Sequence, residues 1–201
     1  MKKIDKETAY LLGALRDASV DVRKGKNYEI KIAQKNRKWL EILQKIISKK
    51  FGYEGKITKH RGNYYILRIT RKTVVEKIIE LAEITTPQSR WNTPVIIKKQ
   101  PLEIQKEYVK GFFDAEGGLP KNPKKWKYIS FDQKIKEPLE FVRSILLKLG
   151  FKPTNLTLTS NVWQFRLTRK NDIINFTLQI GSLHPDKIKK LHLLTKLLRG
   201  S

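Results

Sequence analysis

The chain has 201 residues, 39% of them hydrophobic, which is enough to bury a core in one large domain or in two of about 100 residues each. Lysine and arginine number 43 against 19 acidic residues, so the formal net charge is +24. Folded proteins with this excess of positive charge usually bind a polyanion, and we expect nucleic acid, with an acidic membrane as the weaker alternative. Because there is no cysteine, disulfides, zinc fingers and thiol catalysis are excluded, and any metal would have oxygen ligands.

The N-terminal sequence MKKIDKETAY carries charge but lacks the apolar segment of a signal peptide. No apolar run approaches the roughly 18 residues of a membrane-spanning helix. We therefore expect an intracellular, cytoplasmic protein that does not associate with a membrane.

The first half of the chain is predicted to alternate helices with pairs of strands. It begins with a helix of small residues, AYLLGALRDAS over residues 9–19. Residues 39–49 (WLEILQKIISK) place apolar side chains at i, i+3, i+4 and i+7, which indicates an amphipathic helix. Residues 64–70 alternate instead, so one face of a strand carries Tyr65, Leu67 and Ile69 and the other carries Tyr64, Ile66, Arg68 and Thr70.

A proline-rich segment separates this half from a second one of the same order. Residues 85–101 (TTPQSRWNTPVIIKKQP) contain three prolines and break both periodicities, so we expect a linker there. A second small-residue helix follows, YVKGFFDAEGG over residues 108–118, and then an amphipathic helix over residues 139–149 (LEFVRSILLKL). The next strand turns Trp163, Phe165 and Leu167 inward and Gln164, Arg166 and Thr168 outward.

The two halves are related by an internal duplication. NYYILRITRK at residues 63–72 and NVWQFRLTRK at residues 161–170 share five of ten residues at an offset of 98. Upstream the offset is 99, since Gln34-Lys35 pairs with Gln133-Lys134. We expect an α+β fold in which a helix–strand–strand–helix–strand–strand–helix unit is repeated about a pseudo-twofold axis, with halves at residues 1–100 and 101–201.

The outward faces of the two antiparallel sheets are predicted to form one continuous basic surface for DNA. Both halves are basic: residues 1–100 contain 24 basic and 10 acidic side chains, and residues 101–201 contain 19 and 9. Polar and basic side chains on such a face can reach base edges and phosphates. The expected contacts are Glu29, Lys31, Lys35, Lys56, Thr58, His60, Tyr64, Ile66 and Arg68 in half one, and Tyr128, Ser130, Asp132, Lys134, Asn155, Thr157, Thr159, Gln164 and Arg166 in half two.

Two carboxylates occupy equivalent places at the ends of the small-residue helices, Asp17 in half one and Glu116 in half two. An acid in the last turn of a helix faces the negative end of the helix dipole, at a cost of roughly 0.3–1 kcal/mol. A divalent cation would offset that cost, with the carbonyls of Ala18 and Ala115 as further oxygen ligands. Small residues at Gly13, Ala14 and Gly111 would let the two helices pack closely and bring both acids to one centre.

These two helices resemble the paired motifs of LAGLIDADG homing endonucleases, of the single-chain, double-motif kind that includes archaeal intron-encoded members. The second motif, residues 109–117 (VKGFFDAEG), matches well and has Glu116 at the position of the metal-binding acid. The first motif departs from the pattern. An ungapped alignment puts Ser19 at the acid position, whereas alignment on Asp17-Ala18-Ser19-Val20 selects Asp17 and keeps the offset of 99. We prefer Asp17, with Ser19 and then Asp21 as alternatives.

The resemblance implies a saddle-shaped monomer that makes Mg²⁺-dependent double-strand breaks in a long, asymmetric duplex target, with Mn²⁺ or Ca²⁺ able to replace Mg²⁺ in binding. It also implies that polar residues around the metal centre position water, which would be Gln34 and Gln133. A basic residue near the scissile phosphate would be Lys98 or Lys187. The three histidines, His60, His184 and His192, have no ligand spacing, and we expect them at the surface or on DNA.

Two other functions compete with the endonuclease. An RNA maturase or a catalytically silent nucleic-acid-binding protein of the same fold would explain the departure in the first motif. A basic structural protein of a ribonucleoprotein would not need the paired acids. In every case the duplication supplies the symmetry, so a second copy of the chain is not required.

Overall fold

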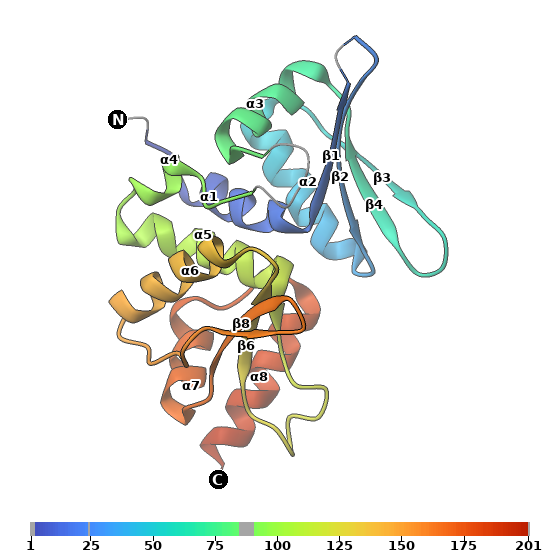
Figure 1. Cartoon of the computed structure of the whole chain (residues 1–201). Coiled ribbons are helices and arrows are strands. Elements are labelled where there is room, and N and C mark those ends of the chain that lie inside the picture. The colour runs from blue at the N-terminus through green and yellow to red at the C-terminus, as the bar shows by residue number, and fades with distance from the viewer. Residues whose placement is uncertain (1–2, 24, 85–90, 201) are drawn as a thin grey trace.

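The two halves repeat one order of elements in the computed structural model, which describes residues 3–23, 25–84 and 91–200 (Figure 1). The first half contains α1 (Lys6–Ala14), the 3₁₀ turn η1 (Leu15–Asp17), β1 (Ala18–Arg23), β2 (Asn27–Gln34), α2 (Arg37–Phe51), β3 (Lys56–Lys59), β4 (Tyr65–Ile69) and α3 (Lys72–Ala82). After α4 (Val95–Lys98), the second half contains α5 (Leu102–Glu116), β5 (Gly117–Gly118), β6 (Ile129–Gln133), α6 (Lys136–Lys148), β7 (Thr157–Thr159), β8 (Val162–Leu167), α7 (Lys170–Gln179) and α8 (Pro185–Arg199).

Each half has one antiparallel four-stranded sheet, with strand order β1-β2-β4-β3 in the first and β5-β6-β8-β7 in the second. The register sets the outward faces. Lys31 lies opposite Arg68, which also lies opposite Lys56, so these three side chains share a face. In the second sheet Ser130 pairs with Arg166 and Asp132 with Gln164. The expected duplicated α+β fold is therefore present, with the predicted strand faces.

Local sequence signals explain where the helices begin and end. The Asn36 side chain accepts a hydrogen bond from the amide of Trp39 at the start of α2. Gly52 ends the helix in the left-handed conformation, with φ at 61°. One face of α2, including Trp39 and Leu43, is fully buried against the core, and each such side chain contributes roughly 1.5–3 kcal/mol by burial.

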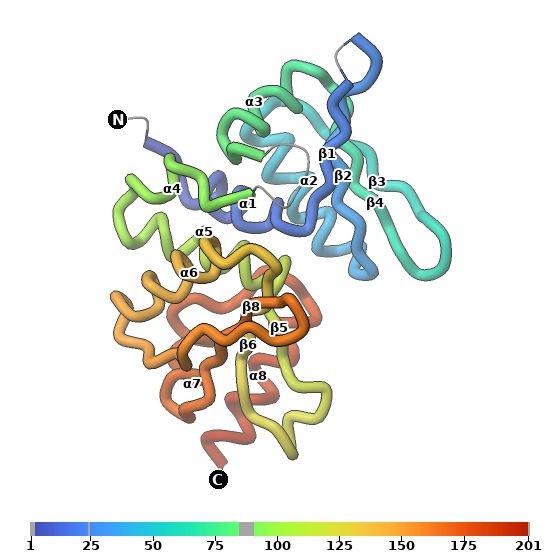
Figure 2. The backbone as a smooth tube through the Cα atoms, viewed as in Figure 1, coloured from blue at the N-terminus to red at the C-terminus, as the bar shows by residue number. Residues whose placement is uncertain are grey.

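The centre of the molecule is the pair of helices α1 and α5, which run side by side (Figure 2). A Cβ on Gly13 would overlap the carbonyl oxygen of Tyr108, and a Cβ on Gly111 would overlap that of Tyr10. Only glycine permits this approach of the two backbones. The same helix pair joins the halves. Helix α1 continues through η1 into β1, and α5 leads directly into β5.

The second half departs from the first in two places. β5 has two residues where β1 has six, because Pro120 has no backbone N–H to continue the strand pairing. Helix α8 is an additional element that the repeat does not predict.

The expected linker is partly structured. Its residues 85–90 lie outside the described part of the chain, but Trp91 is buried and α4 forms within the remainder. Across the described ranges no helix is long and apolar enough to cross a bilayer.

Candidate active site

Asp17 and Glu116 lie at the ends of the central helix pair, Asp17 as the last residue of η1 and Glu116 as the last residue of α5. Each is followed at once by the first strand of its sheet. The two carboxylates are near enough that the charge of Asp17 raises the pKa of Glu116. The structure therefore brings the two predicted acids to one centre.

One glutamine in each half holds the carboxylate of that half. Gln34, the last residue of β2, donates a side-chain hydrogen bond to Asp17. Gln133, the last residue of β6, donates to the Oε1 of Glu116 at 3.0 Å. The donor follows its acid by 17 residues in both halves. The duplication thus extends from the backbone to the hydrogen bonds of the site.

Both carboxyl groups are harder to ionise than free ones. Burial raises the pKa of Asp17 to about 6. Burial, with a further contribution from the charge of Asp17, raises the pKa of Glu116 to about 7. Two partly desolvated acids that lie close together repel when both are charged. Such a pair is a favourable place for a cation.

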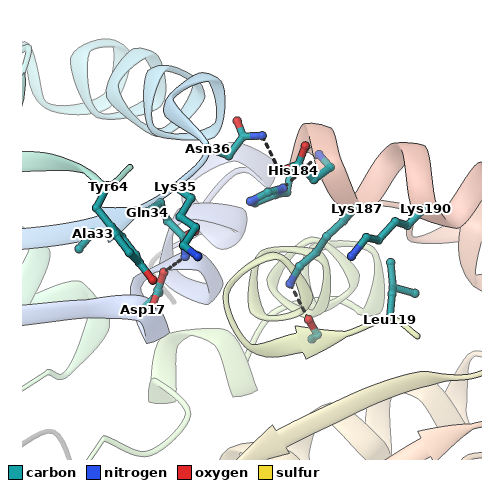
Figure 3. Close-up of a pocket in the computed structure, with 12 residues that line it drawn as sticks. Asp17, Ala33, Gln34, Lys35, Asn36, Tyr64, Leu119, His184, Lys187 and Lys190 are labelled. Atoms are coloured by element: carbon teal, nitrogen blue, oxygen red, sulfur yellow. Dashed lines mark hydrogen bonds between the residues drawn. The ribbon is translucent and has the colours of Figure 1, made fainter. Parts of the chain in front are cut away.

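Lys187, near the start of α8, supplies a positive charge at this centre (Figure 3). Its Nζ donates hydrogen bonds to the carbonyls of Phe113 at 2.5 Å, Asp114 at 3.0 Å and Gly117 at 2.6 Å. These carbonyls belong to the last turn of α5 and the residue after it, where the helix dipole is negative. Burial lowers the pKa of Lys187 to about 8. The ammonium therefore acts as a fixed cation at the helix end.

A cavity of about 460 Å³ opens beside Asp17 between the two halves (Figure 3). Three lysines from both halves line it, Lys35, Lys187 and Lys190. Its rim includes Asn36, whose side chain donates to Asp186 at 2.9 Å across the interface. A cavity with an acid at its base and lysines around it can accept a phosphate group next to a cation.

The donor set fits a divalent cation that is shared with a bound phosphate. No group of three or more His, Cys, Asp or Glu side chains with metal-binding geometry occurs among residues 3–23, 25–84 and 91–200. Within these ranges the site therefore offers two carboxylates and no complete cage of protein ligands. Mg²⁺ is commonly bound this way, by one or two carboxylates together with substrate phosphates and water.

Comparisons with known proteins identify the family. The sequence profile of the LAGLIDADG-like domain matches residues 5–81 and again residues 103–181. The chain belongs to the LAGLIDADG family. It is 36% identical to the homing endonuclease I-ApeI of Aeropyrum pernix over 191 residues, which cover 91% of this chain and 84% of that protein.

Solved structures of LAGLIDADG nucleases share the fold. I-DmoI in complex with DNA and Mn matches with a TM-score of 0.66 and 24% identity, over 89% of this chain and 98% of that one. Further structures of I-DmoI contain DNA with Mg or with Ca. I-WcaI bound to its DNA recognition sequence matches with a TM-score of 0.64 and 13% identity, over 95% and 88% of the two chains.

The three candidates for the first acid differ in their contacts. Ser19 lies opposite Lys31 on the outward face of the sheet. Asp21 is further along β1, where it accepts hydrogen bonds from Arg23 at 3.1 Å and from Asn27 at 2.8 Å. Of the three alternatives, only Asp17 is held by the repeated glutamine contact.

Lys98 is not brought to the site. Its ammonium pairs with Glu137 at 2.7 Å, and its carbonyl accepts from Gln105 in the first part of α5. Gln105 is about 16 Å along the helix from Glu116 at 1.5 Å per residue. The expectation that Lys98 lies near the scissile phosphate is therefore dropped, whereas Lys187 is at the centre. The roles of the Ala18 and Ala115 carbonyls as metal ligands stay a prediction.

Most of the expected DNA contacts lie on the outward faces, but three are covered. Ile66 is only 6% exposed. Glu29 is buried by ion pairs with Lys31 at 2.9 Å and Arg68 at 2.5 Å. Ser130 is buried and donates to Asp132 at 2.8 Å. These three side chains are buried and so are not displayed to DNA in this structure.

The remaining predicted contacts are exposed or partly exposed: Lys31, Lys35, Lys56, Thr58, His60, Tyr64 and Arg68 in half one, and Tyr128, Asp132, Lys134, Asn155, Thr157, Thr159, Gln164 and Arg166 in half two. His192 is exposed as expected. His184 is not: it is buried, and desolvation lowers its pKa to about 4.

Sequence reasoning missed a buried hydrogen-bond network around Asp114 of the second motif. Asp114 is 1% exposed, and it accepts from the hydroxyl of Tyr10 at 2.6 Å and from the amides of Leu183 at 2.8 Å and His184 at 3.1 Å. The Tyr10 hydroxyl in turn accepts from Trp39 at 2.8 Å. The Asp114 carboxyl group thus links α1, and through Tyr10 also α2, to the start of α8, and this link helps to position Lys187. The only available signal was an acid inside an apolar helix face.

Proposed function

We propose that this chain is a homing endonuclease that hydrolyses one phosphodiester in each strand of a long, asymmetric duplex DNA target. The observation that carries the proposal is the pair of carboxylates, Asp17 and Glu116, held by equivalent glutamines at the ends of a glycine-packed helix pair. The kinship with I-ApeI, a homing endonuclease, supports it. One acid for each half suits one cut for each strand.

Asp17 and Glu116 would hold a divalent cation, and we propose Mg²⁺. When bound, such a cation supplies a hydroxide nucleophile at neutral pH and stabilises the charge on the leaving oxygen. Mn and Ca, which occur with DNA in structures of I-DmoI, are expected to replace Mg²⁺ in binding.

The chain's own residues orient the reacting groups. Gln34 and Gln133 each occupy one carboxylate with an amide donor, which fixes the direction of the remaining lone pairs. Lys187 adds a fixed positive charge, while Lys35 and Lys190 on the cavity wall would contact the phosphate entering the site. Because Lys187 already donates to three carbonyls, we assign it an electrostatic role and no proton transfer.

The outward faces of the two sheets would hold the duplex. Residues 1–100 would contact one half of the target and residues 101–201 the other, so a monomer suffices. Binding should weaken steeply with salt, by about 0.9 in the log–log slope for each phosphate neutralised.

The test is cleavage of a duplex selected from a random library by the wild-type protein. Asp17→Asn and Glu116→Gln are each expected to abolish cleavage in Mg²⁺ while leaving duplex affinity within about threefold. Asp21→Asn is the matched control, because this partly exposed acid of β1 contacts Arg23 and Asn27 and is expected to retain full cleavage.

Two results would redirect the proposal. Tight binding by the wild-type protein without cleavage in Mg²⁺ or Mn²⁺ would favour a silent binder or an RNA maturase. Function that is unchanged by both substitutions would favour a structural role in a ribonucleoprotein.

A further inference from the structure

The segment between β5 and β6, residues 119–128, replaces most of a strand with an ordered turn. Pro120 and Pro123 prevent strand pairing, since neither has a backbone N–H. Asn122 organises the turn: its side chain accepts from the amide of Lys124 at 3.1 Å, and its carbonyl accepts from the amide of Trp126 at 3.0 Å. We call this segment the lysine–tryptophan loop.

The loop exposes a tryptophan among four lysines and no acidic residue. Trp126 is 58% exposed, whereas Trp39 and Trp91 are buried in the core. The sequence LPKNPKKWKY contains four lysines and no acidic residue. The Nζ of Lys125 lies 5.5 Å from the centre of the indole ring, so the loop combines a rigid aromatic plane with a positive charge beside it.

The loop continues the DNA-facing side of the second sheet. It leads into Tyr128 and Ser130, and Ser130 lies opposite Arg166 on the outward face. Arg166 stacks over the ring of Tyr128 at 4.9 Å. The loop and the β3–β4 hairpin of the first half extend from the body toward the same side (Figure 1).

The equivalent turn of the first half has no such feature. It joins Arg23 to Asn27 directly at the end of the β1–β2 pairing, and its sequence RKGKN contains no aromatic residue. The nearest aromatic residue along the first half of the chain is Tyr28 of β2, whose ring centre lies 5.0 Å from the Nζ of Lys72, so the exposed tryptophan is a feature of the second-half turn.

We infer that the lysine–tryptophan loop is a backbone-binding site for duplex DNA at the outer end of the half-two footprint. The inference rests on the proposed function. The lysines would neutralise phosphates, and the indole of Trp126 would pack against the deoxyribose between them. Such contacts are independent of sequence, so they anchor the half whose first strand offers only Gly117 and Gly118 for base contacts.

Tryptophan emission tests the contact with a mixed-sequence duplex of about 30 base pairs in Ca²⁺. We expect the duplex to quench part of the wild-type emission, and we expect Trp126→Phe to lose that response. An equal response in Trp126→Phe would overturn the inference. Because this readout needs only binding, it reports on the loop even if the wild-type protein cleaves no DNA and the proposed function fails.

Affinity for shortened duplexes tests the position. On the full selected duplex, Trp126→Ala is expected to weaken binding about tenfold, and Lys124→Ala/Lys125→Ala is expected to lower the salt slope by about one for each lysine. Trimming the duplex at the half-two end should remove both differences. Lys26→Ala in the half-one turn is the matched control. Its effect on duplex affinity should disappear only when the duplex is trimmed at the half-one end. Unchanged affinity in Trp126→Ala with the full duplex, or effects that survive trimming at the half-two end, would refute the loop site while leaving the cleavage assignment intact.

Discussion

The ammonium of Lys187 donates a 2.6 Å hydrogen bond to the carbonyl of Gly117, the residue that follows Glu116. A side chain from the C-terminal helix thus neutralises the negative end of the helix that carries the second acid. Its charge also lowers the pKa of both Asp17 and Glu116, against the larger effect of burial. Four predictions follow from this arrangement and from the packing around it.

Lys187→Met is expected to raise the pKa of both acids, because it removes a nearby positive charge. The acid limb of the pH–rate profile for cleavage should therefore move to higher pH by roughly half a unit to one unit. The free energy of unfolding should fall by about 1–3 kcal/mol, since three carbonyls lose their donor. Lys190→Met removes an exposed ammonium from the same cavity and should weaken DNA binding while keeping the acid limb in place. An unshifted limb in Lys187→Met would contradict the electrostatic role.

The two acids should make the metal-free protein less stable as the pH rises. Burial raises their pKa values to about 6 and about 7, from the free values of 3.8 and 4.5. The folded state therefore keeps these protons to higher pH, and the stability they contribute is complete below about pH 4 and lost as the pH rises to about 7. Urea unfolding at pH 5 and pH 8 should show that Asp17→Asn/Glu116→Gln is more stable than wild type by roughly 2–4 kcal/mol at pH 8 and by much less at pH 5. Equal pH dependence of the two proteins would show that the carboxyl groups are ordinary surface acids.

Stabilisation of the folded protein by Mg²⁺ should increase as the pH rises, because the cation requires both acids to be ionised. At tenfold above its Kd a bound ion contributes about 1.4 kcal/mol, or about 3–5 °C in Tm for a chain of this size. Thermal melts with and without Mg²⁺ should show this shift at pH 8 and little at pH 5. The double variant Asp17→Asn/Glu116→Gln should show no shift at either pH. A shift of the same size in that variant would place the metal elsewhere.

Gly13→Ala should destabilise the protein by at least about 1–3 kcal/mol, the usual cost of overpacking. The added Cβ would overlap the carbonyl of Tyr108 and lie 2.6 Å from the amide nitrogen of Phe112, and both are helix backbone atoms that cannot rotate away. Because α1 and α5 would be forced apart, cleavage should fall more than DNA binding does. Gly200→Ala, whose Cβ meets only a carbonyl at 3.6 Å, should stay within about 0.5 kcal/mol of wild type in urea unfolding. A Gly13→Ala protein of wild-type stability would show that the backbones of α1 and α5 are farther apart than in this structure.

Sequence patterns were sufficient for the duplicated fold and for the place of one acid at the end of each motif helix. Strand alternation and helical periodicity are local properties, so they fix which side of each element is apolar without knowledge of the partner. The constant spacing from Asp17 to Gln34 and from Glu116 to Gln133 then made the acids and their glutamines a repeated unit. Neither property depends on how the two halves meet.

Other features depended on packing and were wrong or absent in the sequence analysis. Ile66 has the alternation of an outward residue, but only 6% of it is exposed. His184 is in a polar segment, yet it is buried beside Trp39, with 5.2 Å between their ring centres. Lys98 is close in sequence to the motif helix, but its ammonium pairs with Glu137 and its carbonyl contacts Gln105 in the first part of α5. Sequence distance carries no information on which neighbour closes over a side chain.

The sequence alone determined that the chain is a basic, duplicated protein with one acid at the end of each motif helix, since composition, repeat and periodicity are properties of the linear chain. Only the tertiary structure decided that Lys187 from α8 reaches the end of α5 and that Asp114 joins three helices and the α7–α8 loop through one buried carboxyl group. Those contacts span about 70 to 100 residues, and they exist because close packing of the helices leaves buried polar groups that must find partners wherever the fold brings them.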